Sequence, residues 1–330
     1  MGTVSEAGVP PAHELLDEVA PLELAPAPAR ELPARVVAAR VSLPVRLKDL
    51  WRSRELFLFL VRKELKVKYK GSILGFLWSM LNPAVVLVVY YVVFTYFLKA
   101  NVPDYALFLF SGLLVWNLFN NALMGSSTSI VAAAGIVKKV AFPREILAMS
   151  QVGAAVVFFG FQLVVMAVFL AGFQVAPAWS WLPLVPFALV DLVVLTAAIA
   201  IFLSAVNVYL RDIEHLIAVL LQAWFWGVPI IYSFNKVYTP SHRWLGYLYL
   251  ADPITPIVLA FQRAFYGKVS YVTYADPVHH LGRVVSYQLA NYPYHFYLVM
   301  LAWVLGIGVV LLLGALVVFG RIEGNFAEEL

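Results

Sequence analysis

The feature that most constrains this chain is a set of long stretches without any Asp, Glu, Lys or Arg, the longest being residues 146–190. A helix needs about 20 apolar residues to cross the roughly 30 Å hydrocarbon core of a bilayer. The longest stretch is about twice that length, and its cluster of Pro and Trp at 177–183 indicates an interfacial turn between two spans. The sequence therefore predicts an all-α membrane protein.

The composition supports this prediction. Apolar residues make up 62% of the 330 residues and charged residues 13%, whereas a soluble domain has about 25% charged residues. One buried core cannot absorb that much apolar surface, because a globular chain still needs a polar exterior. The chain has no cysteine, which excludes disulfides, thiolate metal sites and cysteine nucleophiles.

We expect six transmembrane helices in this chain, at about 75–97, 105–137, 146–173, 184–210, 215–235 and 295–320. Residues 236–294 do not fit a seventh span, since their best apolar run, 254–262, is short and follows Asp252-Pro253. Backbone at membrane depth must be covered by protein or line a cavity. We therefore predict short re-entrant helices on the outer face between spans five and six, followed by a polar loop.

The positions of the basic residues predict the orientation of these spans. With the N-terminus inside, 17 of the 23 Lys and Arg residues lie on the cytoplasmic side, as the positive-inside rule requires. This predicts a multi-pass protein of the plasma (inner) membrane with both termini in the cytoplasm. The whole chain has a net charge of +4, and residues 30–70 form a basic collar with twelve Lys and Arg against four acids. This distribution suits a membrane surface and argues against nucleic acid as a partner.

Three regions are expected along the chain. Residues 1–45 read as a disordered, acidic and Pro-rich cytoplasmic tail, without the basic-then-apolar order of a secretory signal. Residues 46–72 are predicted to form an amphipathic helix in the cytoplasmic interface, with Phe57, Leu58 and Val61 on its apolar face. The alternative for this segment is a solvated basic leader. Residues 73–330 form the expected six-span domain.

Residues that could carry catalysis are scarce in this chain. It contains no phosphate-binding P-loop, no Gly-x-Ser-x-Gly elbow and no His-Glu-x-x-His motif. We therefore expect no enzymatic activity, no metal site and no ATP site in this chain. Asp191 is the single acidic residue clearly inside a span, where a carboxylate costs at least ~2.5 kcal/mol. The alternatives for Asp191 are a functional role, a side chain that reaches the outer interface, or a partner within the bundle.

Five motifs resemble those of one family. They are KYKGSILGFLWSMLNP at 68–83, FPREIL at 142–147, YLRDI at 209–213, DPIT at 252–255 and GRIEGNFAE at 320–328. In this order they resemble ABC type-2 permeases that export polysaccharides, and the likeness covers about residues 50–330. The family usually has Asn-Pro where this chain has Asp252-Pro253.

The resemblance implies a homodimer that works with two copies of a separate ABC ATPase, which binds ATP and Mg²⁺. Its implied substrate is a lipid-linked polysaccharide moved outward, such as O-antigen, teichoic acid or actinobacterial galactan. Two other functions stay open from the residues alone. One is a membrane transferase acting on glycosyl or polyprenyl-phosphate substrates, and the other is a secondary carrier.

Three groups of candidate site residues follow. Aromatic residues near the middle of spans can stack on sugar rings without holding any one of them tightly, although most membrane aromatics serve packing or interfacial belts. The expected substrate channel comprises Tyr90, Tyr91, Phe94, Trp116, Trp224 and Trp226. The expected ATPase-coupling residues are Lys138, Lys139, Pro143, Arg144, Glu145, Arg211 and Asp212. The expected outer gate, held by Asp252 or Arg263, comprises Asp252, Pro253 and Arg263.

Overall fold

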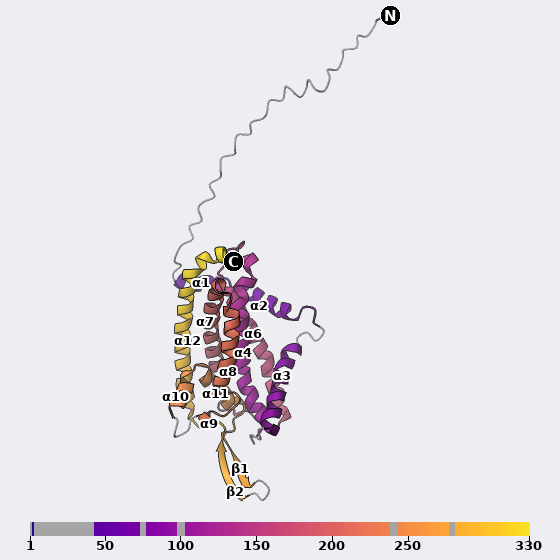
Figure 1. Cartoon of the computed structure of the whole chain (residues 1–330), viewed down its shortest axis with the longest axis vertical. Helices are drawn as coiled ribbons and strands as arrows, with labels where there is room; N and C mark the ends of the chain where they lie inside the picture. The colour runs from indigo at the N-terminus through magenta and orange to yellow at the C-terminus, as the bar shows by residue number, and fades with distance from the viewer. Residues whose placement is uncertain (1, 3–42, 73–76, 98–102, 238–242, 277–280) are drawn as a thin grey trace. The chain divides into compact units, whose positions relative to one another are not determined.

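The computed structural model describes residues 2, 43–72, 77–97, 103–237, 243–276 and 281–330 (Figure 1). Residues 40–330 form one unit and residues 1–39 a separate one. The tail predicted over 1–45 lies almost entirely outside the described residues.

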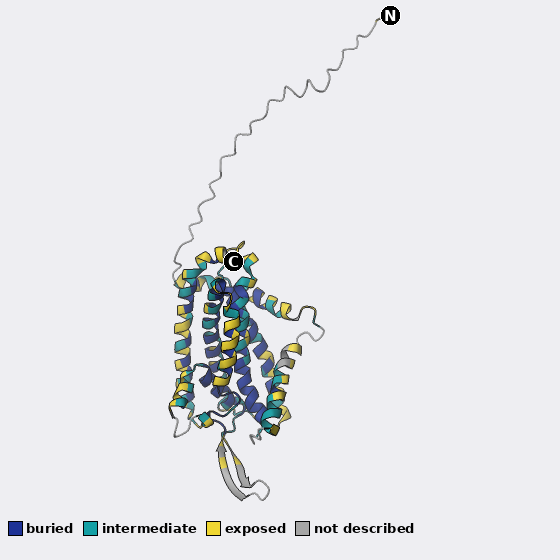
Figure 2. Ribbon diagram, in the orientation of Figure 1, coloured by how far each residue is buried: buried dark blue, intermediate teal, exposed yellow. Residues whose placement is uncertain are grey.

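Four helices are long and apolar enough to cross a membrane: α4 (Tyr105–Ala132), α6 (Glu145–Gly172), α7 (Leu184–Tyr209) and α12 (Tyr294–Ile322). They coincide within a few residues with four of the expected spans. Figure 2 shows that α4 is the most deeply covered of them, whereas α12 turns much of its surface outward. In α4, 78% of an apolar 18-residue stretch is buried, compared with 28% of such a stretch in α12. The apolar exterior of α12 is what a lipid-facing helix needs.

Two further apolar helices are shorter than a full span. α3 (Leu77–Val92) continues into the π-helical turn η1 (Val93–Phe97), and α8 is Ile213–Gly227. They lie where spans one and five were expected. A third apolar unit is the pair α10 (Arg243–Ala251) and α11 (Ile254–Phe265), which bend by 92° at Asp252-Pro253. By length and composition, the described residues thus contain four spanning helices, or five if the bent pair is one span.

The leader predicted as one helix over 46–72 is two helices, α1 (Leu43–Arg52) and α2 (Arg54–Tyr69), which break at Ser53. α2 packs on α6, where a Cβ at Gly153 would lie only 2.7 Å from Cγ2 of Val61. This contact buries Leu60 and Val61 but leaves Leu58 49% exposed. Of the apolar face predicted with Phe57, Leu58 and Val61, Val61 therefore packs within the subunit while Leu58 is open to the surroundings.

A β-hairpin departs from the expected all-α fold. Strands β1 (Ser270–Asp276) and β2 (Leu281–Tyr287) pair antiparallel, with Val272 opposite Val285. They replace the polar loop predicted here. Their β-branched and aromatic residues are typical of strands, a signal separate from the apolar runs that predict spans.

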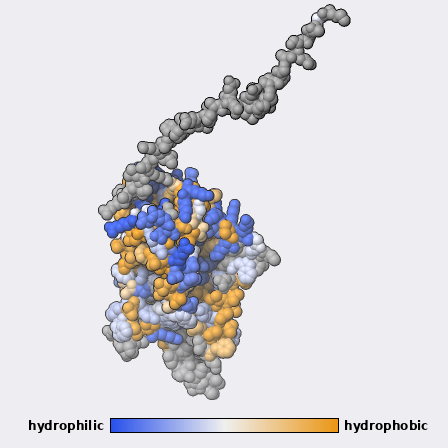
Figure 3. Space-filling model, turned by 45° about the horizontal axis from the view of Figure 1, so that its top comes forward, coloured by the Kyte–Doolittle hydropathy of each residue, from blue (hydrophilic) through white to orange (hydrophobic). Residues whose placement is uncertain are grey.

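The two ends of the helix bundle differ. Figure 1 shows α1 and the C-terminal segments at one end, and α9 (Phe234–Val237), α10 and the hairpin at the other. We call these the α1 end and the hairpin end. The C-terminal segments are the 3₁₀ turn η3 (Glu323–Asn325) and α13 (Phe326–Glu329). Figure 3, which brings the α1 end forward, shows hydrophilic residues gathered there and hydrophobic patches around them.

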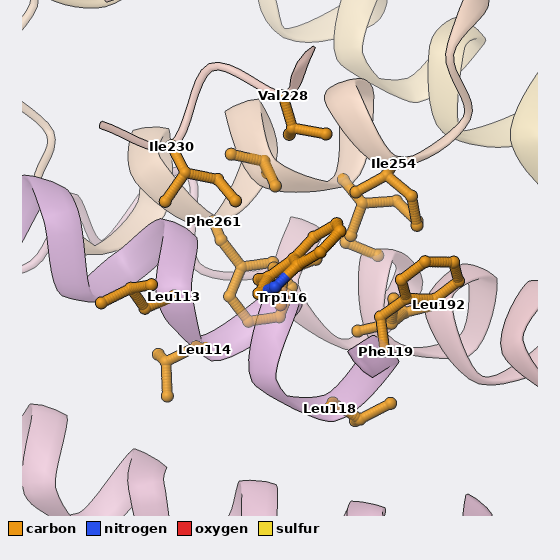
Figure 4. Close-up of a cluster of buried hydrophobic side chains, with 14 of the residues drawn as sticks. Leu113, Leu114, Trp116, Leu118, Phe119, Leu192, Val228, Ile230, Ile254 and Phe261 are labelled. Atoms are coloured by element: carbon orange, nitrogen blue, oxygen red, sulfur yellow. The ribbon is translucent and has the colours of Figure 1, made fainter. Parts of the chain in front are cut away.

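Buried apolar side chains form two clusters. The larger surrounds α4 and joins it to α7, α8 and α11. Figure 4 shows Trp116 and Phe119 of α4 in this cluster, beside Val228 and Ile230 of the segment after α8 and Phe261 of α11. The smaller cluster lies at the α1 end and includes Leu60, Ile146, Ile201, Phe319 and Phe326.

Candidate functional site

The helix α8 stops inside the bundle. It contacts α4 through the ring pairs Trp116–Phe225 and Phe119–Trp224, near the middle of that 28-residue helix. α8 ends at Gly227, and residues 228–233 continue without helical structure. The span predicted over 215–235 is therefore a broken helix.

Side chains from distant elements satisfy the backbone of this irregular segment. Nε2 of Gln262 donates a 2.9 Å hydrogen bond to the carbonyl of Pro229, and the hydroxyl of Tyr105 donates one of 2.7 Å to that of Ile231. Non-helical backbone is tolerated among membrane helices only where protein or water supplies such partners. Gly112 makes room for the segment, since a Cβ there would lie 3.1 Å from Cγ2 of Ile230 and 3.3 Å from Nε2 of Gln262.

Asp252 joins this region to the bent pair α10–α11. Its carboxylate accepts a 3.1 Å hydrogen bond from Nε1 of Trp224 on α8. It also accepts bonds from the hydroxyl and the backbone N–H of Thr255, at 2.9 and 3.1 Å, and thus caps the start of α11. Every one of these partners is a donor. A carboxylate, which only accepts, suits this position better than the amide of an Asn, which has a single acceptor oxygen.

The aromatic residues predicted to line a channel divide into two sets. Tyr90, Trp116 and Trp224 pack within the subunit. Tyr90 stacks on Phe225 of α8 with centroids 6.2 Å apart, and Trp116 lies 5.4 Å from the same ring. Trp224, itself on α8, meets Phe119 of α4 edge-on. Trp116 is 7% exposed.

The remaining channel candidates lie at the edge of this group or outside it. Phe94 stacks on Tyr105 at 5.4 Å, and the half-buried Tyr91 meets Tyr96 edge-on at 6.4 Å. Trp226 meets Phe225 edge-on at 5.8 Å but is 51% exposed, so much of its ring is open to an occupant of a channel.

Amide side chains near these rings were missed by the sequence analysis. Asn117 of α4 donates a 3.2 Å hydrogen bond to the buried Gln162 of α6, and Asn121 donates one of 2.7 Å to the carbonyl of Asn117. Gln222, one turn before Trp226 on α8, is exposed, as is Asn121. The signal that could have found them is an amide inside an otherwise apolar span, which a search for charged residues ignores.

The predicted coupling residues gather at the α1 end but do not share one environment. Lys138 and Lys139 are exposed after the short helix α5 (Ala134–Val137), and so are Arg211 and Asp212 between α7 and α8. Pro143, Arg144 and Glu145 precede and begin α6. Arg144 is half-buried and Glu145 is 1% exposed. The exposed residues can meet a partner protein, whereas Arg144 and Glu145 are held in internal contacts.

The predicted gate residues act at opposite ends of α11. Asp252 and Pro253 form its start, and Arg263 lies in its last turn. The guanidinium of Arg263 lies 4.3 Å from the ring centroid of Trp181, in the turn between α6 and α7, and donates a 3.3 Å hydrogen bond to the carbonyl of Gly267. Both residues therefore hold the bent pair, Asp252 to α8 and Arg263 to the hairpin-end turn.

Asp191 on α7 is 3% exposed, and its Oδ2 has no hydrogen-bond partner among the described residues. The described residues therefore provide no partner for this oxygen within the bundle. Within the same described segments, no three His, Asp or Glu residues gather as a metal site would require.

Comparison with known proteins identifies the family of this chain. A family model described as "ABC-2 type transporter" matches residues 55–266 and stops just before the β-hairpin. The chain is 33% identical over 222 residues to the O-antigen export system permease protein RfbA of Myxococcus xanthus, which covers 67% of this chain and 84% of that protein. It is 29% identical over 232 residues to a protein of the same name from Klebsiella pneumoniae, covering 70% and 88%. The chain therefore belongs to the ABC-2 type transporter family, as a multi-pass membrane subunit that pairs with an ABC ATPase and is not itself an enzyme.

Proposed function

We propose that this permease is the channel subunit of an ATP-driven exporter that moves a lipid-linked polysaccharide from the cytoplasm to the outer side of the plasma membrane. The observation that carries this proposal is the broken helix α8, which presents Trp226 and Gln222 on its exposed side at the level of mid-α4. An amide at that depth is costly against lipid but suits a water-filled path that carries sugar hydroxyls. The export permeases to which the chain is similar carry O-antigen in their names.

The proposed topology has six spans, formed by the four long helices together with α3–η1 and α8. The α1 end faces the cytoplasm, since exposed Lys138, Lys139, Arg211 and Arg321 lie there. The bent pair α10–α11 then enters and leaves the membrane at the outer face. Its 92° bend and its location at the hairpin end support this assignment.

A homodimer completes the proposed channel. One subunit leaves the side of α8 that carries Gln222 and Trp226 uncovered, and a second copy facing it would enclose a path between the two. Rings such as Trp226 offer flat, weakly binding faces, and weak repeated sites let a polymer leave as well as enter. The amides of Gln222 and Asn121 would supply hydrogen bonds to the same chain of sugars. O-antigen, teichoic acid and galactan belong to the substrate class that such a path suits.

Energy comes from two copies of the partner ATPase, which hold ATP and Mg²⁺, with no cofactor bound by this chain. The exposed charges Lys138, Lys139, Arg211 and Asp212 would meet a groove on that ATPase. The outer gate is the bent pair, tied to α8 through Asp252 and to the turn at Trp181 through Arg263.

The test is export in a strain that lacks its own permease, with this chain and its ATPase supplied together. We expect the lipid-linked polysaccharide to appear outside only when the ATPase can hydrolyse ATP. Export that continues with an ATPase variant that binds but does not hydrolyse ATP would indicate a secondary carrier. Transfer of a sugar or a polyprenyl phosphate without any ATPase would indicate a membrane transferase.

A further inference from the structure

Arg46 is buried in a helix that otherwise displays its basic residues. Lys48 and Arg52 of α1 are exposed, but Arg46 is only 6% exposed. Its Nη1 bonds to Oε1 of Glu145, the first residue of α6, and its Nη2 bonds to Oε1 of Glu323, just after α12. One guanidinium thus joins the leader, the C-terminal segment and residues 138–145, which we call the coupling segment.

The last turn of α12 is shaped around this guanidinium. A Cβ at Gly320 would lie 2.9 Å from Nη2 of Arg46 and 3.0 Å from its Cζ, so any larger residue there would displace the guanidinium. The ring of Phe319 lies 5.9 Å from Cζ, within range of a cation–π contact. The position of Arg46 is therefore set by packing as well as by charge.

A second arginine closes the cluster from the other side. Nη1 of Arg144, in the coupling segment, donates to the backbone carbonyl of Glu323, and its Cζ lies 5.7 Å from the ring centroid of Phe326. The hydroxyl of Tyr209, at the end of α7, donates a 2.7 Å hydrogen bond to the carbonyl of Ile322. Residues 322–326 thus receive contacts from α1, from the coupling segment and from α7.

The charges in this cluster balance, since Arg46 and Arg144 face Glu145 and Glu323. Buried ion pairs add little net stability compared with apolar packing, and in some proteins they specify geometry instead. A forked guanidinium can hold two carboxylates at once in fixed directions, which the point charge of a lysine cannot do. A cluster of this kind favours one relative position of the three segments.

We propose that Arg46 is a positioning residue for energy coupling, and that it makes the coupling segment, the leader and the C-terminal end of α12 move as one body. This inference rests on the proposed coupling role of Lys138 and Lys139. Displacement of those residues by the ATPase reaches Glu145 and is passed through Arg46 to Glu323. Without Arg46, the same displacement moves the coupling segment alone and shifts the leader and the C-terminal end of α12 less.

The first test neutralises Arg46 together with both carboxylates that it bonds, and it leaves the half-buried Arg144 on the carbonyl of Glu323. The neutral variant Arg46→Met/Glu145→Gln/Glu323→Gln is reconstituted with the ATPase, and both ATP hydrolysis and polymer export are measured per assembled complex. We expect hydrolysis to continue while export per ATP falls about fivefold or more, the lower range of an allosteric coupling. Arg46→Lys should fall between this variant and the wild type, and Lys48→Gln on the same helix should match the wild type. Export per ATP at the wild-type level in the neutral variant would overturn the proposal. A drop in total export that is fully explained by less assembled complex would overturn it as well.

The second test needs no polymer. Because the chain has no cysteine, spin labels can be placed at Lys48→Cys on α1 and Val140→Cys in the coupling segment, both exposed, in one subunit of the complex. We expect one narrow distance distribution that is kept through ATP binding and hydrolysis, and a broad one once Arg46 is replaced by Met in the neutral variant. Equal widths in the two proteins would overturn the proposal. If the narrow distribution is found but no polysaccharide is exported, the assigned substrate fails while the role of Arg46 stands.

Discussion

Nε1 of Trp224 donates a hydrogen bond of 3.1 Å to Oδ1 of Asp252, and this bond joins the broken helix α8 to the bend between α10 and α11. The two residues had been predicted for different tasks, Trp224 for the channel and Asp252 for the outer gate. Their contact means that the bent pair cannot move away from α8 unless this bond breaks. Opening of the proposed gate and rearrangement of α8 are therefore expected to occur together.

A double-mutant cycle tests this bond. Trp224→Phe removes the donor but keeps a ring, and Asp252→Ala removes the acceptor. Each change should raise the leak of small sugars through resting vesicles that contain the protein. The double variant should leak little more than Asp252→Ala alone, because residues in direct contact are not additive. Trp244→Phe, an exposed tryptophan of α10, is the control. Fully additive leaks would show that the two residues act separately.

The irregular segment after α8 should depend on Gln262 for its stability. Gln262→Leu leaves the carbonyl of Pro229 without its donor, which costs about 1–3 kcal/mol for a buried group. We expect a lower Tm for the purified protein in detergent. Gln222→Leu makes the same change at an exposed position of α8 and should leave Tm unchanged. Equal Tm values for the two variants would mean that another group satisfies Pro229.

The contact between α2 and α6 can be tested with two glycines of the same helix. A Cβ at Gly153 would lie 2.7 Å from Cγ2 of Val61 and 2.8 Å from Cζ of Phe57, whereas nothing lies within 4 Å of a Cβ at Gly160. Gly153→Ala should overpack this contact, which lowers its stability by about 1–3 kcal/mol, and α2 should detach from α6 more often. Trypsin should then cleave faster at Arg62 and Lys63, with Gly160→Ala as the control. Similar cleavage rates in both variants would contradict the packing.

The exposed and the buried coupling residues should respond differently to charge reversal. Lys138→Glu/Lys139→Glu changes only exposed positions. It should lower co-purification of the ATPase by about tenfold, roughly 1.4 kcal/mol, without changing Tm. Arg144→Glu places a carboxylate beside the carbonyl of Glu323 and should lower Tm as well as co-purification. Lys66→Glu on the exposed side of α2 serves as a control for net charge. An unchanged complex in the lysine variant would remove these residues from the ATPase contact.

The packed and the exposed aromatic residues should respond differently to substitution by alanine. Trp116 is 7% exposed within the core, and Trp116→Ala should destabilise the protein by about 3–5 kcal/mol through the cavity it leaves. Trp226→Ala should instead slow export per assembled complex while leaving Tm close to that of the wild type, since Trp226 is 51% exposed. Leu220→Ala, equally exposed on α8, is the control. Full export by Trp226→Ala would exclude this ring from the path.

The long helices could be predicted from the sequence because the information that specifies them is local. A helix satisfies its own backbone, so an uncharged apolar run of sufficient length is enough to form one in lipid. The run 146–190 accordingly yields α6 and α7, with the turn at its Pro and Trp residues. The hairpin was equally local in its Tyr, Val and Thr residues, which favour strands, but the count of apolar spans considered helices alone.

The site depends on contacts that no local pattern contains. Residues 215–235 contain no Asp, Glu, Lys or Arg. The end of α8 at Gly227 depends on Gln262 and Tyr105, which satisfy the backbone beyond it. Arg46 reads in the sequence as one member of a basic collar. Its burial depends on Glu145 and Glu323, which lie 99 and 277 residues away along the chain. A charged side chain is buried only where the fold supplies ion-pair or hydrogen-bond partners that offset the cost of removing it from water. Apolar sequence alone therefore determined where the spans lie, and the tertiary structure decided where a span breaks and which charges are buried.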